Sequence, residues 1–179
     1  PDDFSESLAE AGARLASCPA ISPDIIDGNG QHQNPHVIRP VSQIRELLYD
    51  LYYWNYYLGC LIRVLALWTR PVFGRQDHAQ HKVARFIHQG YGACYILTRT
   101  FFRHFDELWA RTFLLGEEYF LSRQLQEKGM SVFYEPSIVV QHLHHSWTHR
   151  TPSRTTWERA RATHRIYRKY VKGWGWSAR

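Results

Sequence analysis

The chain has 179 residues, of which 44% are hydrophobic and 21% are charged. This apolar content excludes an intrinsically disordered chain and suffices for one compact domain of ordinary size. The formal net charge is +6, which favours anionic partners such as phosphates, nucleic acid or an anionic membrane surface. The odd number and scattered spacing of the three cysteines argue against a disulfide framework and a CxxC metal site, and they fit a reducing compartment.

The N-terminal 40 residues predict one helix followed by an irregular segment. Residues 2–17 contain a partial apolar stripe, and aspartates at the start can cap the helix. Pro19 and Pro23 are expected to end this element. Residues 24–40 are rich in Gly, Asn and Pro, which predicts short strands or loop.

A long amphipathic helix is predicted over residues 42–70, with Ser42 as its cap. Between Leu47 and Trp68 the only charges are Asp50 and Arg63. The uninterrupted apolar run is too short for a transmembrane helix. Its many Trp and Tyr residues are typical of a membrane interface, so the helix is expected either to lie on a bilayer or to be buried against its own domain.

Strands and helices alternate in the rest of the chain. The run Ala93–Thr98 predicts a buried strand, and Thr100 can cap the short helix that follows. A second helix is predicted over Glu118–Lys128 and ends at the C-cap Gly129. Two further strands are predicted on either side of Pro136. This alternation indicates an α/β fold with a mixed sheet flanked by helices.

The final predicted element is a basic helix over residues 153–172. A single buried stripe with a spacing of three to four residues runs along it, and cations occupy its other faces. These cations form either a solvated surface or a surface that binds phosphate groups. The stripe is Trp157, Ala160, His164, Tyr167 and Val171, and the cations are Arg154, Arg159, Arg161, Arg165, Arg168 and Lys169.

Two adjacent carboxylates, Glu117 and Glu118, follow Gly116 at the predicted start of a helix. The helix dipole stabilises carboxylate charge at this position by about 0.3–1 kcal/mol. Backbone N–H groups can hold one carboxylate while the other points into a cleft, where the neighbouring charge raises its pKa toward that of a useful base. The alternative is a pair of helix-start carboxylates without a catalytic role.

A histidine cluster follows the last predicted strand and comprises His142, His144, His145 and His149. Imidazole ligates transition metals and donates to phosphate oxygens. His142 stands at the carboxyl end of its strand, where ligands gather in α/β sheets. A closed structural zinc site would need cysteine partners, which are absent nearby. The alternative is a surface loop that contains several histidines.

Taken together, these motifs resemble a known family. The stretch from "GYGACYILTRTFF" through "FDELWARTFLLGEEYFLSRQLQEKG" to "EPSIVVQHLHHSW" is similar to the C-terminal half of the catalytic domain of family 2 glycosyltransferases. It is closest to the rhamnosyltransferase-like members, which build bacterial surface polysaccharides. The likeness covers roughly residues 90–172, and "PDDF" at the start resembles the family's "PDFL". The matched positions are Gly92-Ala93, Arg99, Phe105-Asp106-Glu107, Gly116-Glu117-Glu118, Pro136 and His142.

The resemblance implies a GT-A fold and an inverting transfer of a sugar from a nucleotide-diphosphate donor to a saccharide or lipid-linked acceptor. It places the general base at Glu118, and Glu117 would orient the acceptor or the loop. His142 would hold the divalent cation, Mg²⁺ or Mn²⁺, or the donor diphosphate. Gly92 and Ala93 fall among the substrate-binding positions. His144, His145 and Arg150 would help to neutralise the leaving diphosphate.

The chain departs from the family pattern in three places. Glu118 stands where the family more often has Asp, and the family's "GG" before "FDE" is replaced near Arg103 and His104. The nucleotide-binding half with its DxD motif is expected upstream, because the "DD" near the start reads as a helix cap. We therefore expect a single partial domain over residues 1–179, inactive alone, in the cytoplasm or peripheral on the inner face of the membrane.

Two other function classes compete with the transferase. The basic charge and high aromatic content also suit a nucleic-acid-binding module, but the sequence has no RNP motif and no paired zinc ligands. Nucleic acid is therefore not the expected partner. A membrane-peripheral module without catalysis, held by residues 42–70, is the other alternative.

Overall fold

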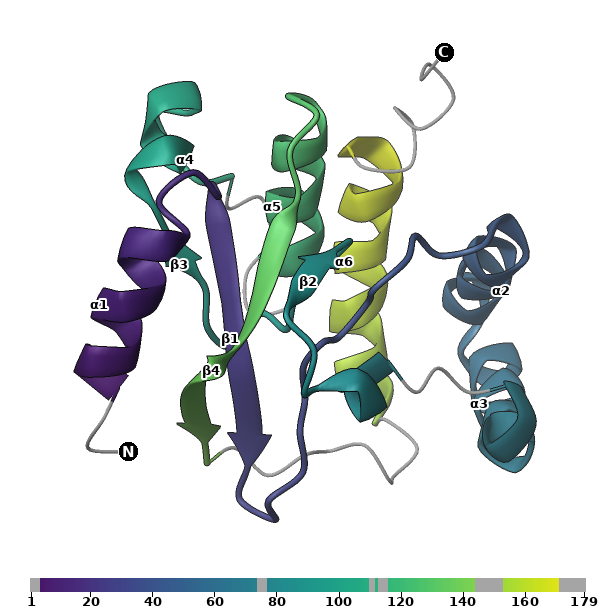
Figure 1. Cartoon of the computed structure of the whole chain (residues 1–179). Helices are drawn as coiled ribbons and strands as arrows, with labels where there is room; N and C mark the ends of the chain where they lie inside the picture. The colour runs from purple at the N-terminus through teal and green to yellow at the C-terminus, as the bar shows by residue number, and fades with distance from the viewer. Residues whose placement is uncertain (1–3, 74–76, 110–111, 113–115, 144–152, 171–179) are drawn as a thin grey trace. The chain divides into compact units, whose positions relative to one another are not determined.

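The computed structural model describes residues 4–73, 77–109, 112, 116–143 and 153–170. The chain divides into two compact units: a sheet unit, residues 1–39 and 77–146, and a helical unit, residues 40–76 and 147–179. Figure 1 labels the elements. In chain order they are α1 (Phe4–Arg14), β1 (Ala20–Asp27), α2 (Gln43–Trp54), α3 (Tyr56–Phe73), the 3-10 helix η1 (Asp77–Gln80), β2 (Arg85–Ile87), β3 (Ile96–Leu97), α4 (Arg99–His104), α5 (Glu117–Gln126), β4 (Val132–His142) and α6 (Arg154–Tyr170).

The sheet unit is built on a four-stranded mixed sheet in the order β2-β4-β1-β3. The two central strands, β1 and β4, are parallel, whereas β2 and β3 pair antiparallel to them at the edges. Helices flank this sheet, which confirms the predicted α/β class.

Two hydrophobic clusters fill the sheet unit. One contains Ala11 and Leu15, from α1 and the turn after it, packed with Ile21 and Ile138 of the central strands. The other packs the helices α4 and α5 against the strands through Phe101, Leu121, Leu125, Val132 and Tyr134, among others. Because neighbouring strand residues point to opposite faces, β1 contributes Ala20 to the second cluster and Ile21 to the first.

The sequence did not predict β1, the buried strand that crosses the centre of the sheet; its second half falls in the segment 24–40, which was expected to form short strands or loop. Proline is unusual in a central strand because it has no N–H to donate. Here the ladder with β3 involves only Ala20 and Ile21, and the register with β4 shifts directly after Pro23. The irregularity therefore accommodates the proline.

Three other boundaries differ from the sequence prediction. The strand predicted over Ala93–Thr98 is reduced to Ile96–Leu97, because only these residues pair with β1. Thr98, rather than Thr100, caps α4 by accepting a hydrogen bond from the Thr100 N–H. The two strands predicted around Pro136 are one strand, β4, in which residues 136–138 bulge between the pairs of β1 and β4.

The helix after the acidic pair closes as predicted. Gly129 has a φ of +69°, a left-handed conformation that glycine adopts without strain. Its N–H donates to the Gln126 carbonyl, and the Met130 N–H donates to the Leu125 carbonyl at 3.0 Å. These two bonds form a Schellman motif. Met130 also packs on the cluster that contains Leu125, so the glycine turns the chain toward β4.

The helical unit contains two helices where one was predicted over residues 42–70. Ser42 caps α2, as expected, and accepts from the Arg45 N–H. The chain then breaks at Asn55, whose side-chain oxygen accepts from the N–H groups of Tyr57 and Leu58. This bonding makes Asn55 an N-cap for α3, because asparagine satisfies the free donors of a new helix.

The basic helix α6 packs against α2 through the predicted stripe. Trp157 and His164 are buried, and the Trp157 indole N–H donates to the Tyr52 carbonyl at 3.3 Å. His164 Nε2 lies 2.9 Å from the Asp50 carboxylate, and the Tyr167 hydroxyl donates to Glu46 at 2.7 Å. No helix among the described residues is long and apolar enough to cross a membrane.

The buried indole generates a stability prediction. Trp157 is 4% exposed and its ring centroid lies 5.6 Å from that of Tyr56. We expect Trp157→Ala to destabilise the protein by about 3 kcal/mol, because it leaves a large cavity between helices. Urea unfolding followed by circular dichroism measures this change. The matched control is Trp68→Ala, which removes a side chain that is 82% exposed and should change stability by less than about 0.5 kcal/mol. If both variants lost the same amount of stability, the burial of Trp157 between the helices would be contradicted.

Candidate functional site

The acidic pair begins α5 directly after a glycine in the left-handed conformation. Gly116 has a φ of 84° and is buried, and no side chain caps the helix there. Glu117 and Glu118 therefore occupy the first turn of α5, where free N–H groups and the helix dipole favour negative charge. This is the placement that the sequence predicts for the pair.

The Glu118 carboxyl is largely enclosed by protein. Burial raises its pKa above the ordinary value, and the charge of Glu117 raises it further, while a hydrogen bond from the backbone N–H of Glu118 partly opposes the shift. Desolvation has this sign because a low-dielectric surrounding disfavours the charged form. A carboxyl with a raised pKa at the start of a helix is suited to exchange a proton with a ligand.

Gly92 makes room for that carboxyl. A Cβ atom at Gly92 would lie 2.9 Å from Glu118 Oε2, closer than real Cβ atoms approach other atoms. Gly90, two residues earlier, is packed in the same way against β1, because a Cβ there would lie 2.3 Å from Ser22 Oγ. The segment 90–92 thus runs close to both β1 and α5, and a side chain at Gly90 or Gly92 would require its neighbours to move.

Asn34 fixes this segment to the sheet. It is fully buried, and its side-chain N–H group donates to Ser22 Oγ at 2.9 Å and to the Pro23 carbonyl at 2.7 Å. Its side-chain oxygen accepts from the Tyr91 N–H at 2.8 Å. One buried amide therefore connects β1 to the residue that separates the two glycines, since each of its polar atoms has a partner.

Tyr91 stands between the acidic pair and the strand ends. Its ring centroid lies 6.0 Å from that of His142 and 5.6 Å from that of His36. Burial raises the pKa of the Tyr91 phenol, and the negative charges of Glu118 and Asp27 raise it further. Both carboxyls are therefore within electrostatic reach of this hydroxyl. Tyr91 brings Glu118 and His142 into one neighbourhood.

The carboxyl ends of the two parallel strands lie next to each other at this site. Asp27 and His142 are register partners at the ends of β1 and β4. One carboxylate oxygen of Asp27 accepts from the N–H groups of Asn29 and Gln31, at 2.8 and 2.9 Å, which closes the turn after β1. Ligands bind in this position in open α/β sheets.

Tyr95 completes the surroundings of Glu118. Burial raises the pKa of the Tyr95 phenol well above its usual range, and the negative charge of Glu118 adds to the effect. The ring also packs against Gly90, where an added Cβ would lie 2.9 Å from it. The charge of Glu118 thus acts on two phenols, Tyr91 and Tyr95, and both remain neutral at physiological pH.

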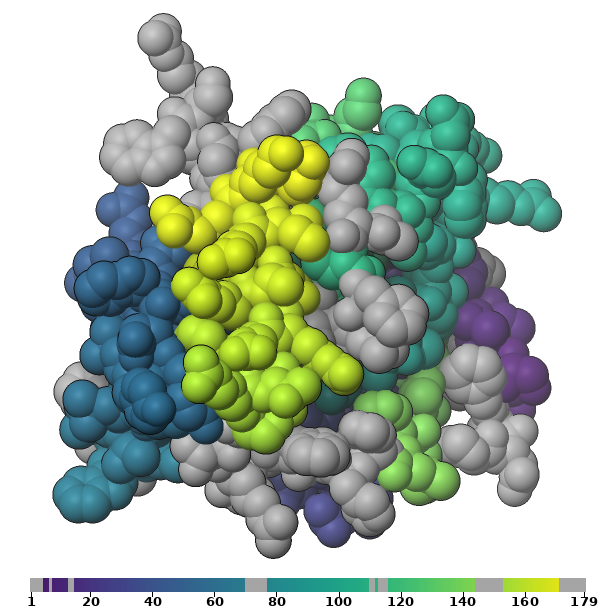
Figure 2. Space-filling model, turned by 180° about the vertical axis from the view of Figure 1, so that it is seen from behind, coloured from purple at the N-terminus to yellow at the C-terminus, as the bar shows by residue number. Residues whose placement is uncertain are grey.

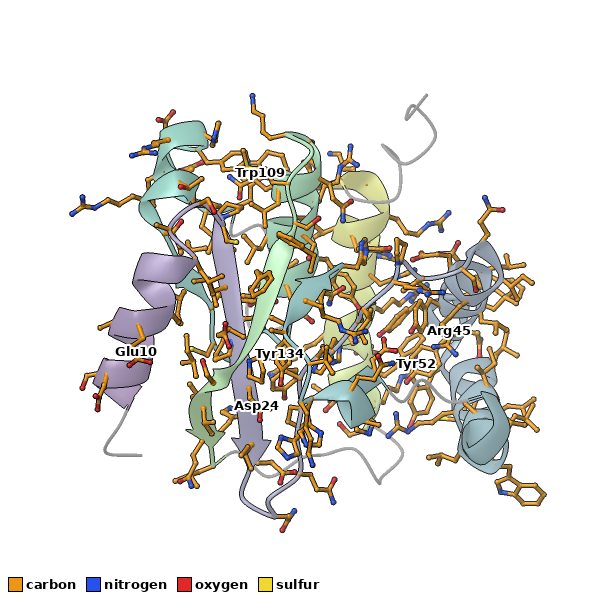
Figure 3. All side chains as sticks on the ribbon, in the orientation of Figure 1. Glu10, Asp24, Arg45, Tyr52, Trp109 and Tyr134 are labelled. Atoms are coloured by element: carbon orange, nitrogen blue, oxygen red, sulfur yellow. The ribbon has the colours of Figure 1, made fainter. Side chains whose placement is uncertain are left out.

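A second polar cluster lies further back along the strands. His32 Nδ1 lies 2.8 Å from an Asp24 carboxylate oxygen, and its ring stacks on His81 with centroids 3.6 Å apart. The Tyr134 hydroxyl donates to the His81 carbonyl at 2.8 Å. Asp24 and Tyr134 lie near each other on β1 and β4 in Figure 3. The stacked rings connect the loop after β1 to the segment that leads into β2, and the two hydrogen bonds attach both to the central strands.

Three of the predicted site residues come together. Glu118, Gly92 and His142 surround Tyr91. Glu117 is beside them in the first turn of α5, and Ala93 is an exposed residue of the turn after Gly92. His144, His145 and Arg150 lie outside the described residues. Among the described residues, no three His, Cys, Asp or Glu side chains are grouped so as to hold a metal ion.

Sequence reasoning missed several residues of the site, namely Asp27, Asn34, Tyr91 and Tyr95. Asp27 was overlooked because β1 was not recognised. The pattern "DGNG" after an apolar run was a usable signal, because Asp and Gly in sequence indicate a turn that closes a strand. No sequence signal distinguishes Asn34 and Tyr91 from other loop residues, since their roles depend on contacts between distant segments.

Comparisons with protein-family models, with curated proteins and with solved structures found no match to this chain.

The raised pKa of Glu118 predicts a pH-dependent gain in stability for Glu118→Gln. In the wild type, the folded protein binds the Glu118 carboxyl proton more tightly than the unfolded chain does. The stability that comes from this protonation is present below the unfolded pKa of Glu118 and is lost as the pH rises through its folded pKa. We expect the variant to match the wild type near pH 4 and to be more stable near pH 8. Urea unfolding at both pH values measures the difference. A variant that is no more stable than the wild type at pH 8 would contradict the burial of an ionisable carboxyl.

Proposed function

We propose that this chain is part of an inverting glycosyltransferase of the GT-A type, in which Glu118 is the general base. The enzyme would move a sugar from a nucleotide-diphosphate donor to a saccharide or lipid-linked acceptor in cell-surface polysaccharide synthesis. The observation that supports this proposal most directly is the common neighbourhood of Glu118 and His142 around Tyr91. The resemblance assigns the general base to Glu118, and it assigns the binding of the cation or the donor diphosphate to His142.

The proposed reaction requires a proton acceptor and a place for the leaving group. The acceptor hydroxyl oxygen attacks the anomeric carbon from the side opposite the diphosphate, while the Glu118 carboxylate takes the hydroxyl proton. The new C–O bond forms as the bond to the diphosphate oxygen breaks, and the electron pair leaves with the diphosphate. A base with a raised pKa holds the transferred proton more firmly.

The strand ends supply donors that suit a divalent cation. His142 offers an imidazole and Asp27 a carboxylate at neighbouring positions of parallel strands. Mn²⁺ accepts both donor types, whereas Mg²⁺ prefers oxygen. A cation held there would neutralise charge on the departing diphosphate. His144, His145 and Arg150 would act on the same group.

The nucleic-acid-binding alternative has less support from the sheet unit. That unit contains nine Lys and Arg residues against thirteen Asp and Glu residues, a net charge of −4. Titration calorimetry on the complete gene product separates the two functions. Binding of a nucleoside diphosphate that requires Mn²⁺ or Mg²⁺ favours the transferase. DNA affinity that falls steeply with salt, without any effect of nucleotide, favours the alternative.

The base assignment predicts the effect of Glu118→Gln in the complete gene product. Glutamine keeps the size of the side chain and cannot take a proton, so transfer should fall by roughly a thousandfold. Donor binding, measured by calorimetry, should stay close to that of the wild type. Glu117→Gln is the matched control and should lose much less activity. Retained turnover in Glu118→Gln would reject the base assignment.

The metal-side assignment predicts the effect of His142→Ala in the same protein. Removing the imidazole should weaken metal-dependent binding of a nucleoside diphosphate by roughly tenfold or more. Calorimetric titrations with and without Mn²⁺ measure this difference. His36→Ala is the control, because His36 contacts Tyr91 from another segment and has no assigned metal role. An unchanged metal dependence in His142→Ala would leave His142 with only a packing role.

A further inference from the structure

The helical unit exposes a large apolar surface. All twelve residues of α2 are described and none of them is buried. The side of α2 that faces α6 carries Glu46, Asp50 and Tyr53. Large apolar side chains cover much of the remaining surface of α2 and α3: Ile44, Leu47, Leu48, Leu51, Trp54, Tyr57, Leu61, Val64, Leu65, Leu67 and Trp68, all exposed. We call this set the apolar face. Exposed apolar patches of this kind mark interaction sites.

The two indoles and the phenol of the apolar face are among its most exposed members. Trp54 is 71% exposed, Tyr57 73% and Trp68 82%. Aromatic rings with one polar atom settle at the boundary between lipid headgroups and acyl chains. Because neither α2 nor α3 meets the requirements for a membrane span, the pattern matches helices that lie in the plane of the interface with one side immersed.

The net charge of the helical unit indicates that the apolar face binds an anionic surface. By sequence, residues 40–76 and 147–179 contain thirteen Lys and Arg residues against three Asp and Glu residues, a net charge of +10. The exposed cations on α6 are Arg154, Arg159, Arg165, Arg168 and Lys169. In Figure 2, α6 (yellow) lies beside the side chains of α2 and α3 (blue). A second copy of the chain would bring another strongly positive unit against this one, whereas anionic lipids attract it.

We propose that the apolar face, with the cations of α6, binds an anionic lipid surface, with α2 and α3 lying in the interface. The Trp and Tyr side chains insert at the headgroup level, and the arginines contact lipid phosphates. The inference does not depend on the proposed transferase activity, because it rests on the helical unit alone. If both proposals hold, the surface would suit an enzyme whose acceptor is linked to a lipid.

The test is co-sedimentation of the full chain with lipid vesicles. One vesicle type contains phosphatidylcholine alone, and the other is an equimolar mixture of phosphatidylcholine and phosphatidylglycerol. We expect at least roughly tenfold tighter binding to the anionic vesicles, because each basic residue near such a surface adds to the attraction. No nucleotide sugar is needed, so a failure here is independent of any failure of the activity assays.

Two variants locate the binding surface. Trp54→Ser/Trp68→Ser should weaken binding to anionic vesicles by roughly tenfold or more, since both rings leave the interface. Arg159→Glu/Arg165→Glu should reduce the preference for anionic lipid. The matched control is Phe102→Ser, which removes an aromatic side chain that is 57% exposed on α4 in the sheet unit and should bind as the wild type does. Circular dichroism verifies that each variant is folded.

Three results would overturn the proposal. The wild type could bind neither vesicle type, or both equally well. The double tryptophan variant could bind like the wild type. Light scattering could show a wild-type dimer that Trp54→Ser/Trp68→Ser converts to a monomer, in which case a second copy covers the apolar face.

Discussion

The parallel pairing of β1 with β4 is the constraint on which the candidate site depends. Only this pairing puts Asp27 beside His142, at the carboxyl ends of the two central strands. Asn34 then attaches the segment 90–92 to β1, because its side chain binds both β1 and the Tyr91 backbone. The bulge at residues 136–138 lets the ladder continue past Pro23 to those strand ends. Without the pairing of residues 24–27 with residues 139–142, Asp27 and His142 would not be neighbours.

The enclosure of Glu118 carries a cost that is informative about function. A carboxyl that is largely removed from water resists ionisation, and Glu117 beside it adds repulsion. Packing alone would be served better by an apolar side chain. The chain instead has glycine at position 92, where a Cβ would press on the carboxyl in its present position. A backbone shaped around one ionisable group is the pattern expected of a residue that exchanges a proton with a ligand.

The two units differ in chemistry as well as in architecture. The sheet unit has a net charge of −4 and buries its apolar residues in two clusters on either side of the sheet. The helical unit has a net charge of +10 and leaves its largest apolar surface exposed. The overall charge of +6 conceals this division. This division agrees with the two proposals, in which the sheet unit acts on a small polar ligand and the helical unit attaches to a lipid surface.

The sequence by itself determined the elements whose signals are local. The caps Ser42 and Gly129, the apolar stripe of α6 and the helix start at the acidic pair depend on neighbouring residues only. Tertiary structure alone decided that β1 is a central strand despite Pro23 and that Tyr91 lies near both Glu118 and His142. The strand pairing and the tyrosine contacts join residues far apart in the chain, and their energies come from burial and hydrogen bonding that no local pattern encodes.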